Sequence, residues 1–338
     1  MLITQNYSLK KHNTFAVDAN AKNFSEVFSE EELIQLVCEE KFKSEKKLIL
    51  GSGSNILFTK DFDGLVIKFS SEDIHIMKEN TESVIIEADA GVNWNELVKF
   101  CVYRNFGGIE NLTLIPGTVG AAPIQNIGAY GQELSEQLDS LNGVFINSGE
   151  KKSFKQNECR FSYRSSIFKE ELKNEFLITS IRLKLSKIPK PNTNYKVLRE
   201  YLLQKEITNP SIKNISNAVA EIRRSKLPDI LKVGNAGSFF KNPIVSEDFL
   251  LKIESEYPDM VSFPSYDGKI KISAGWLIEK CGWKGKRIGN VGTSPDHALV
   301  ICNFGGATGA EILEFAVRIK EEVANKFGIK FEEEVNIL

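Results

Sequence analysis

The chain has few of the residues from which metal sites and disulfide frameworks are built. Its 338 residues include only three histidines and five cysteines. The cysteines are odd in number, lie far apart and form no C-x-x-C pair, so neither a zinc site nor a set of disulfides is expected. With so few histidines, a histidine-rich metal centre is not expected either. The sequence therefore predicts reduced thiols and no bound metal.

Long apolar runs and an excess of positive charge are also missing. The chain contains no eighteen consecutive apolar residues, and its first residues, Met-Leu-Ile-Thr-Gln-Asn, lack the basic-then-apolar order of a signal peptide. The formal net charge is -2, so the protein lacks the excess positive charge that attracts nucleic acid. We therefore expect a cytoplasmic protein that binds neither membranes nor nucleic acid.

What is present is the composition of an ordinary globular protein, 42% hydrophobic and 26% charged. Because 338 residues exceed one typical domain, two or three domains are expected. Alternating and 3.6-residue patterns are mixed along the chain, which indicates an α+β protein with a boundary near residue 220. Strands are expected over 47–50, 65–67, 84–88 and 176–185, and helices over 93–104, 216–226 and 308–327. Capping-box pairs, Asn93 with Glu96 and Thr308 with Glu311, mark the starts of the first and last of these helices.

The most informative segment is 235–243, Asn-Ala-Gly-Ser-Phe-Phe-Lys-Asn-Pro. In it the hydroxyl of Ser238 follows a glycine, which lets the backbone approach another group closely. Phe239 and Phe240 are expected to offer apolar surface beside that hydroxyl, and a cation and an amide follow them. Taken alone, the segment leaves both catalysis and plain packing open.

A second unusual segment, 111–131, contains four glycines, two prolines and no charged residue. It is too rich in glycine and proline for a helix and too apolar for a solvated linker. Such backbone can wrap tightly around a bulky ligand with polar and aromatic parts. The alternative is a buried crossover between strands.

A glycine-rich loop, Gly51-Ser-Gly-Ser-Asn55, follows an expected strand. It lacks the third glycine of the dinucleotide-binding pattern G-x-G-x-x-G because Ile56 occupies that place, and the chain has no G-K-[ST]. Successive small residues can still offer N–H groups and hydroxyls to a pyrophosphate. A simple hairpin turn is the other interpretation.

Together, eight segments closely resemble one family, the UDP-N-acetylenolpyruvoylglucosamine reductases, also called UDP-N-acetylmuramate dehydrogenases. The chain is similar to the long-form members. The matching segments run in family order from residue 50 to the C-terminus, so the resemblance covers nearly the whole chain. They are 50–55, 115–120, 123–131, 163–168, 226–229, 235–243, 274–279 and 334–335.

The resemblance implies an α+β fold with a two-lobed FAD-binding region of the vanillyl-alcohol-oxidase type, followed by an α+β substrate-binding domain. The FAD-binding lobes are expected at 1–70 and 71–219, and the substrate-binding domain at 220–338. It also implies a cytoplasmic step of peptidoglycan precursor synthesis. In that step NADPH reduces FAD, and the reduced flavin passes a hydride to the enolpyruvyl ether of UDP-N-acetylglucosamine, giving UDP-N-acetylmuramate. NADPH and the UDP-sugar are the expected partners, using one pocket in turn, and a monomer is expected.

Three residues are implied to be catalytic: Arg164, Ser238 and Glu334. Hydride addition to C3 leaves an enolate-like carboxylate, which needs cationic support at its charge and a proton at C2. Arg164 suits a carboxylate because its guanidinium can bind in a bidentate way. Ser238 is implied as the proton donor, and Glu334 as the group that polarises or protonates the enolate. From the residues alone, Arg164 could instead form a surface salt bridge and Glu334 belong to an acidic terminus.

The resemblance further implies two sets of binding residues. The substrate set comprises Tyr163, Tyr195, Lys226, Asn242 and His297, with Lys226 facing the diphosphate as a compact cation. The FAD set comprises Gly51, Ser52, Gly53, Ser54, Asn55, Gly117, Thr118, Gly120, Ala121, Gln125, Asn126, Ile127, Gly128 and Arg223. The alternative for Arg223 is an exposed arginine on a helix.

The chain departs from the family pattern at two places. His297 stands where long-form relatives carry a glutamine, and histidine adds the possibility of a pH-dependent charge. Phe263-Pro264 falls near a tyrosine that covers the diphosphate in those relatives, so either Tyr266 substitutes for it or the contact is lost.

Two other functions remain open at this point. An oxidase of small alcohols or lactones on the same flavin fold would react rapidly with oxygen and ignore UDP-sugars. A nucleotide-sugar-binding regulator would be colourless and show ligand affinity only.

Overall fold

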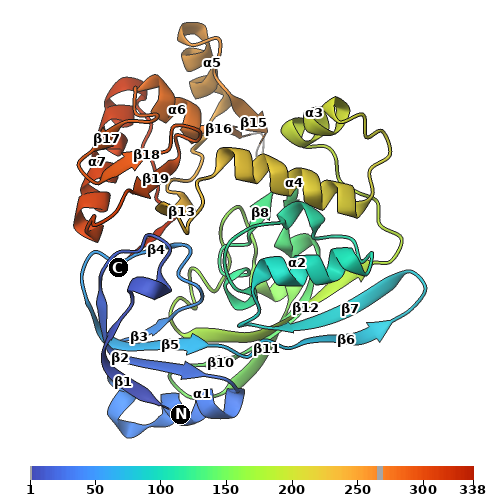
Figure 1. The fold of residues 1–338 in the computed structure, drawn as a ribbon, viewed down its shortest axis with the longest axis vertical. Helices are drawn as coiled ribbons and strands as arrows, with labels where there is room; N and C mark the ends of the chain where they lie inside the picture. Colours follow the sequence, from blue (N-terminus) through green and yellow to red (C-terminus); the bar gives the residue numbers. More distant parts are fainter. Residues whose placement is uncertain (1, 265–268) are drawn as a thin grey trace. The chain divides into compact units, whose positions relative to one another are not determined.

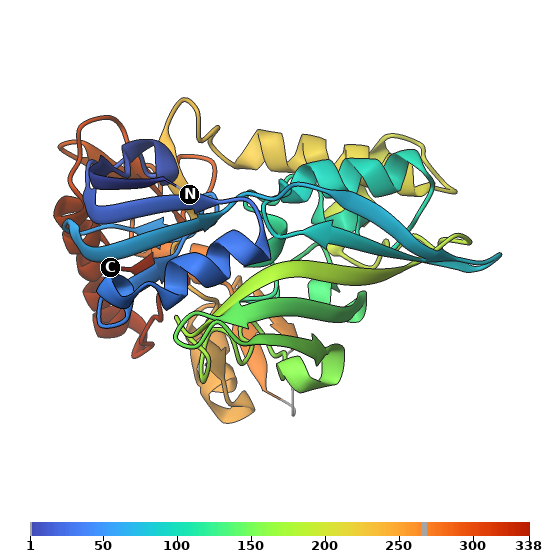
Figure 2. The same cartoon turned by 90° about the horizontal axis from the view of Figure 1, so that it is seen from below.

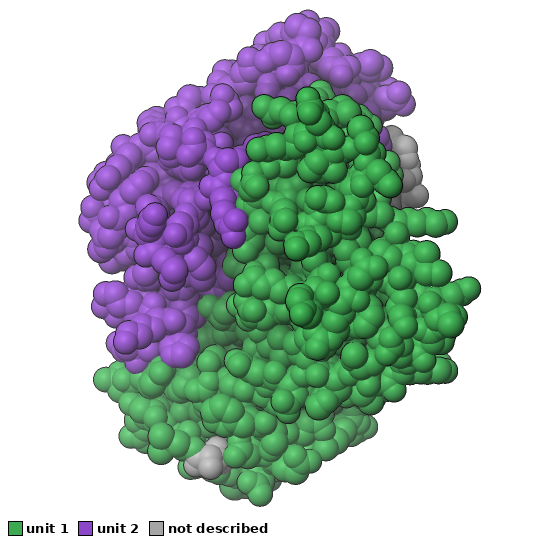
Figure 3. Space-filling model, turned by 45° about the vertical axis from the view of Figure 1, so that its right-hand side comes forward, with its two compact units in different colours: residues 1–7, 21–52, 62–223 green, residues 8–20, 53–61, 224–338 purple. Residues whose placement is uncertain are grey.

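The computed structural model describes residues 2–264 and 269–338, and Tyr266 lies outside the described residues. The chain forms two compact units that interleave along the sequence. Unit 1 comprises residues 1–7, 21–52 and 62–223, and unit 2 comprises residues 8–20, 53–61 and 224–338 (Figure 3). Two short N-terminal segments, 8–20 and 53–61, therefore group with the C-terminal part of the chain. The division into lobes at 1–70, 71–219 and 220–338 stays a prediction.

The first sheet of unit 1 has the strand order β1-β2-β5-β3 (Figure 1). Its strands are β1 (Ile3–Ser8), β2 (Asn20–Val27), β5 (Phe62–Phe69) and β3 (Lys47–Ile49). β5 runs parallel to both β2 and β3. Parallel neighbours need a crossover, and α1 (Glu30–Cys38) lies between β2 and β3 in the chain. Ser29 begins α1 because its Oγ accepts a hydrogen bond from Glu32 N at 3.1 Å.

The second sheet of unit 1 is antiparallel, with the order β11-β10-β12-β7-β6. Its strands are β11 (Lys151–Lys155), β10 (Leu138–Phe145), β12 (Phe176–Ser186), β7 (Ser83–Asp89) and β6 (Ile74–Glu79). The strands expected at 84–88 and 176–185 are thus confirmed. In β7 every second residue is buried, as alternation predicts for a sheet with one covered face. Figure 2 shows β6 and β7 extending together as a long ribbon.

Unit 1 also contains α2 (Trp94–Tyr103), α3 (Lys196–Gln204) and α4 (Ile212–Lys226), except that the last three residues of α4 belong to unit 2. Asn93 begins α2, because its Oδ1 accepts hydrogen bonds from the N–H groups of Asn95 and Glu96. The helix expected from residue 216 starts earlier, at Ile212, because Ile212 and Ile215 are buried and extend its apolar face. Residues of α3 and α4 pack against each other in one buried cluster (Figure 1).

The glycine- and proline-rich segment 111–131 contains no long helix. It holds the 3₁₀ turns η3 (Glu110–Leu112) and η4 (Val119–Ala121) and the first strand of a short hairpin, β8 (Gly128–Ala129) with β9 (Gln132–Glu133). The other 3₁₀ turns of the described residues are η1 (Lys10–His12), η2 (Glu40–Phe42), η5 (Leu134–Glu136) and η6 (Gln156–Cys159).

Unit 2 is built on a sheet with the order β13-β19-β18-β17. The strands are β13 (Gly234–Ser238), β19 (Val300–Asn303), β18 (Val291–Thr293) and β17 (Arg287–Ile288). Buried side chains of α6 (Ala274–Lys280) and α7 (Gly309–Phe327) belong to one hydrophobic core with residues of this sheet. A small sheet, β14 (Ile244–Val245), β16 (Ile270–Ile272) and β15 (Ser262–Pro264), accompanies α5 (Glu247–Glu256). The chain's last strand, β20 (Asn336–Ile337), pairs in parallel with β4 (Ile56–Leu57).

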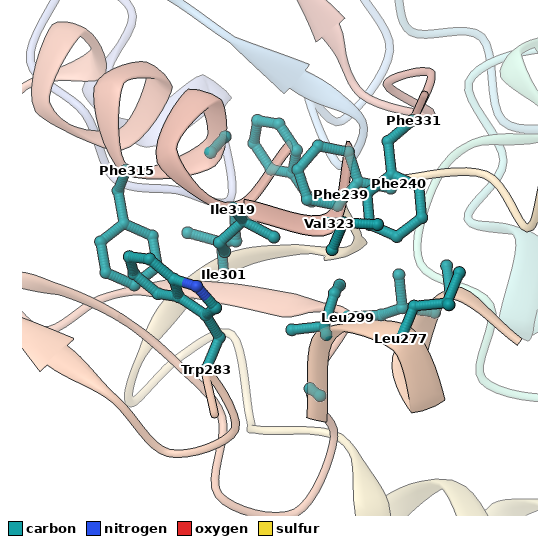
Figure 4. Close-up of a cluster of buried hydrophobic side chains, with 14 of the residues drawn as sticks. Phe239, Phe240, Leu277, Trp283, Leu299, Ile301, Phe315, Ile319, Val323 and Phe331 are labelled. Carbon is teal, nitrogen blue, oxygen red and sulfur yellow. The ribbon is translucent and has the colours of Figure 1, made fainter. Parts of the chain in front are cut away.

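The core of unit 2 contains both phenylalanines that follow Ser238 (Figure 4). Phe239 and Phe240 are 0% and 1% exposed, and their ring centroids lie 5.1 Å apart. Phe240 also packs on Phe331, with 5.0 Å between ring centroids. The expectation that these two rings offer apolar surface beside the hydroxyl is therefore wrong. The backbone of Phe239 is also paired on both sides, since its N–H donates to Leu299 O and its carbonyl accepts from Glu334 N.

The predicted capping box at the start of α7 is confirmed. Thr308 Oγ1 accepts a hydrogen bond from Glu311 N at 3.2 Å, and Glu311 Oε2 accepts one from Thr308 N at 2.7 Å. Gly328 ends the helix in the left-handed conformation, at φ +69°. Among the described residues, no helix combines the length and apolar character needed to cross a membrane.

Replacing Thr308 with alanine is expected to lower the free energy of unfolding by about 1 kcal/mol at pH 7. Hydrogen bonds from the backbone N–H and hydroxyl of Thr308 lower the pKa of Glu311, so their stabilisation is present above the unfolded-state pKa. It is lost as the pH falls through the folded-state value. Urea unfolding at pH 7 and pH 3 should therefore show a smaller difference between wild type and variant at pH 3. The exposed Thr81, replaced by alanine, is the control, and an equal loss at both pH values would contradict the Glu311 contribution.

Candidate functional site

The glycine-rich loop begins in unit 1, where Gly51 lies against the 117–121 turn. A Cβ on Gly51 would come within 2.8 Å of Thr118 Oγ1 and 3.5 Å of Ala121 Cβ, so a larger residue here would force the Thr118 side chain to shift. Gly120 is equally constrained, because its Cβ would lie 2.5 Å from Ala90 Cβ. The 117–121 turn and the start of the loop thus form one closely fitted backbone surface.

The hydroxyl of Ser52, the next residue of the loop, fits a bound phosphate. Its Oγ is buried and has no hydrogen-bond partner among the described residues. A buried hydroxyl left unpaired costs roughly 1–3 kcal/mol, and a phosphate oxygen would remove that cost. A free hydroxyl beside glycine backbone is chemistry that suits the diphosphate of FAD.

In unit 2 the same loop is held by the N-terminal segment and by the end of the chain. Gly53 has φ +65°, and a Cβ on it would lie 1.9 Å from His12 O. Asn55 Nδ2 donates a hydrogen bond to Glu334 O at 3.0 Å. In return, Asn336 N and Nδ2 donate to Asn55 O at 3.0 and 3.1 Å. An expected cofactor residue, Asn55, is thus bonded to the backbone of an expected catalytic residue, Glu334.

Tyr163 and Arg164 form the tip of a tight turn in unit 1. Ser162 N donates to Ser165 O at 3.1 Å, and Ser165 N donates to Ser162 O at 3.2 Å. Arg164 has φ +55°, a left-handed conformation that costs a non-glycine residue roughly 1–2 kcal/mol. Arg164 Nη2 donates to Gly128 O at 3.0 Å, and Lys169 Nζ donates to Arg164 O at 3.2 Å. Strain of this kind is typical of residues held for a function.

Arg223, near the end of α4, is buried at its guanidinium rather than exposed. Its Nε has no hydrogen-bond partner among the described residues. Burial lowers the pKa of Arg223, the nearby Tyr130 raises it, and the positive charge of Arg164 lowers it further. Two guanidinium groups close enough to repel each other favour an electron-rich group between or beside them. The alternative of an exposed helix arginine is therefore wrong, and Arg223 fits a hydrogen-bonding flavin ring.

Tyr130 lies near Arg223 but was not among the predicted site residues. Its ring meets that of Tyr195 edge to face, with 5.3 Å between centroids, and burial raises the pKa of both tyrosines. Asn111 Nδ2 donates to Tyr130 O at 2.8 Å and fixes the turn. The available signal was an aromatic residue between Ala129 and Gly131, and the structure holds that residue at a positive φ of +49°.

Unit 2 places Ser238 and Glu334 at one end of the same backbone ladder. Lys241 N donates to Glu332 O at 2.9 Å, and Glu334 N donates to Phe239 O at 2.8 Å. With the antiparallel bridge between Phe240 and Glu333, these bonds pair 239–241 with 332–334. Ser238 immediately precedes one strand of the ladder and Glu334 ends the other. Both side chains are half-buried.

The three consecutive glutamates 332–334 do not form one solvated acidic cluster. Glu332 pairs with Lys241 at 3.0 Å, and Glu333 pairs with Lys320 of α7 at 2.5 Å. The pair of Lys320 and Glu333 is half-buried on both sides, with 30% and 25% of the side chains exposed. Each of the first two glutamates is thus tied to a separate element, and the backbone of Glu334 is fixed on both sides.

The remaining predicted substrate residues lie at different places in unit 2. Asn242 follows the ladder, and its Oδ1 accepts a hydrogen bond from Ala274 N at 2.9 Å. His297 lies in the turn before β19, where its carbonyl accepts a hydrogen bond from Val300 N at 3.0 Å. Because Ser238 pairs with Val300, this turn lies beside Ser238. Lys226 is exposed at the end of α4, and Phe263 is 36% exposed in β15.

Of the other predicted FAD residues, Gly117, Asn126 and Ile127 are buried and Ser54, Gln125 and Gly128 are half-buried. Among the residues that the structure describes, no three or more His, Cys, Asp or Glu side chains gather where they could hold a metal ion.

Two family descriptions match the chain. Residues 22–152 match an FAD binding domain, and residues 229–338 match the C-terminal domain of UDP-N-acetylenolpyruvoylglucosamine reductase. The predicted α+β class, with an FAD-binding region followed by a C-terminal domain, is thereby confirmed.

Full-length relatives carry the same description. The chain is 46% identical to the UDP-N-acetylenolpyruvoylglucosamine reductase of Flavobacterium johnsoniae, with 100% of each chain covered. It is 41% identical to that of Pseudomonas aeruginosa, over 99% of this chain and 98% of the relative. The crystal structure of the corresponding Thermus caldophilus reductase has a TM-score of 0.70 and 24% identity, and covers 99% of this chain and 98% of its own. That last likeness concerns the fold.

Proposed function

Because the chain belongs to the UDP-N-acetylenolpyruvoylglucosamine reductase family, an oxidoreductase family, we propose that it reduces UDP-N-acetylglucosamine enolpyruvate to UDP-N-acetylmuramate. FAD is the proposed cofactor and NADPH the proposed co-substrate. The observation that carries the proposal is the ladder of unit 2, which brings a hydroxyl and a carboxyl to one end of paired strands 96 residues apart in sequence, Ser238 and Glu334. Family membership supports three further proposals. The reaction belongs to peptidoglycan precursor synthesis, it takes place in the cytoplasm, and the protein is a monomer.

Bound FAD would supply the hydride chemistry, taking a hydride from NADPH and delivering it to C3 of the enolpyruvyl group. The chain's own residues then stabilise charge and move a proton. Arg164 holds the substrate carboxylate, whose charge grows as the enolate forms. The hydroxyl of Ser238 donates the proton to C2, and Glu334 polarises or protonates the developing enolate.

The binding residues divide by the chemistry that they offer. Ser52 and the backbone at Gly51 are proposed to hold the diphosphate of FAD, and Arg223 its ring. Tyr163, Tyr195, Lys226, Asn242 and His297 are proposed to contact the UDP-sugar. Lys226 would meet the diphosphate of that substrate as a point charge.

An anaerobic titration tests the function. The purified protein is reduced with one equivalent of NADPH, UDP-N-acetylglucosamine enolpyruvate is added, and the visible flavin band is followed. Rapid return of the band is expected. A band that bleaches and returns only with oxygen would favour an oxidase, and a colourless protein that does not take up FAD would favour a binding protein.

Replacing Lys226 with alanine is expected to weaken the affinity for the UDP-sugar about tenfold or more, because hydrogen bonds to charged groups contribute roughly 1.5–3 kcal/mol. FAD retention should stay at the wild-type level. The matched control is Lys232→Ala, which removes an exposed cation a few residues away. Substrate affinity from equilibrium titration decides the outcome, and an unchanged value for Lys226→Ala would remove its diphosphate role.

A further inference from the structure

We propose that Asn126 is a positioning residue for Arg164, a role that deepens the proposed function and rests on it. The resemblance assigns Asn126 to FAD, but its side chain is 1% exposed and already bonded within unit 1. Asn126 Nδ2 donates to Glu133 Oε2 at 2.7 Å and to Ser162 O at 3.3 Å. Asn126 Oδ1 accepts from Ser135 N at 3.0 Å.

These bonds use the donors of the amide completely. An asparagine side chain carries two N–H donors, and here one is directed to Glu133 and the other to Ser162. No side-chain donor is therefore left for a cofactor. What the amide does instead is join the β8–β9 hairpin, with residues 134–135 that follow it, to the 162–165 turn that carries Arg164.

Two further bonds link the 162–166 stretch to the same segment of backbone. Arg164 Nη2 donates to Gly128 O at 3.0 Å, and Ser166 Oγ donates to Ile124 O at 2.8 Å. Asn126 lies between these two anchors in sequence and bonds to the first residue of the turn. Arg164 is held at φ +55°, so its conformation depends on bonds that offset the strain.

The backbone at residue 126 explains why an asparagine stands there. Asn126 has φ +45°, a conformation that asparagine and aspartate adopt more readily than other non-glycine residues. Asn126→Asp therefore keeps the backbone preference and removes the two donors, and it sets a carboxylate against Glu133. Asn126→Gly also keeps the backbone preference and removes the side chain without adding charge.

The test measures the rates of the two flavin half-reactions. It also measures FAD affinity and the amide hydrogen exchange of the holoprotein. In both variants, flavin reoxidation at saturating UDP-N-acetylglucosamine enolpyruvate should slow at least about tenfold, since a 1 Å misplacement can cost roughly 10²-fold. FAD affinity and flavin reduction by NADPH should stay within about threefold of wild type. Amide exchange should rise in a peptide spanning 160–168 and stay unchanged in one spanning 84–89. Asn142→Asp is the control, because Asn142 makes side-chain hydrogen bonds to Ser180 and Ser153 elsewhere in unit 1.

A double-mutant cycle separates positioning from a general loss of structure. In a Glu133→Gln background the added effect of Asn126→Asp should be smaller, because the opposing carboxylate is gone. Unchanged exchange over 160–168 in both Asn126 variants would overturn the proposal. So would a loss of FAD affinity above about tenfold with the saturated reoxidation rate intact. The exchange measurement does not require turnover, so a wild-type protein that fails to reduce the enolpyruvyl substrate would overturn the proposed function and still leave the role of Asn126 decided.

Discussion

Replacing Ser238 with alanine is expected to slow reoxidation of the reduced flavin by the enolpyruvyl substrate by about 10²–10⁴-fold, the usual contribution of a positioned general acid. Reduction of the flavin by NADPH should stay close to the wild-type rate, because that half-reaction needs no proton at C2 of the substrate. Stopped-flow absorbance of the flavin band, recorded separately for the two half-reactions, is the measurement. If only the rate of flavin reoxidation falls, Ser238 acts in proton donation. If both rates fall, the substitution has changed flavin binding.

The structure makes Ser238→Ala a clean test. Ser238 is half-buried at the end of β13, and the ladder beyond it is formed by backbone atoms that the substitution leaves in place. Ser255→Ala, on the exposed side of α5, is the matched control for losing one hydroxyl in unit 2. Equal slowing of both half-reactions would contradict the assignment of Ser238 as the proton donor.

Replacing Phe239 with alanine is expected to lower the free energy of unfolding of unit 2 by about 3–5 kcal/mol, the range for a fully buried phenylalanine. Phe239 is 0% exposed and meets Phe15 and Phe240 edge to face, so its removal leaves a cavity lined by aromatic rings. Urea unfolding followed by tryptophan fluorescence measures the loss. Trp276 and Trp283 both belong to the core that contains Phe239 and report on it.

The control for this loss is a phenylalanine that is already exposed. Phe28 is 58% exposed, and its replacement by alanine should change stability by no more than about 0.5 kcal/mol. A loss below about 1 kcal/mol for Phe239→Ala would place that ring outside the core and restore the sequence-based interpretation of an apolar surface beside Ser238.

The features of the fold that could be predicted are those with local causes. Asn93 and Thr308 were identified as helix starts because a capping side chain bonds to N–H groups two or three residues ahead. The alternation at the end of β12 was readable because Ile181, Leu183 and Leu185 are buried while the two residues between them are not. The start of α4 was predicted four residues too late, at Ser216. The apolar face of the helix in fact begins with the buried Ile212 and Ile215.

The candidate site could be predicted from the sequence only in part, through the family resemblance. That resemblance named Arg164, Ser238 and Glu334, but it did not distinguish a side chain that contacts a ligand from one that holds such a side chain. Asn126 and Tyr130 illustrate the gap. The bonds of Asn126 to Glu133 and Ser162, and the electrostatic effect of Tyr130 on Arg223, depend on turns that meet only in the folded chain.

The sequence by itself determined the fold class, the helix caps and the set of residues that the family uses, because local hydrogen bonding, periodicity and motif order are all written along the chain. Only the tertiary structure decided that Phe239 and Phe240 are core residues, and that Asn55 bonds to Glu334 across a separation of 279 residues. The physical reason is that burial and pairing between distant segments are properties of the packed chain. They arise when many residues are brought together at once, and no single stretch of sequence contains them.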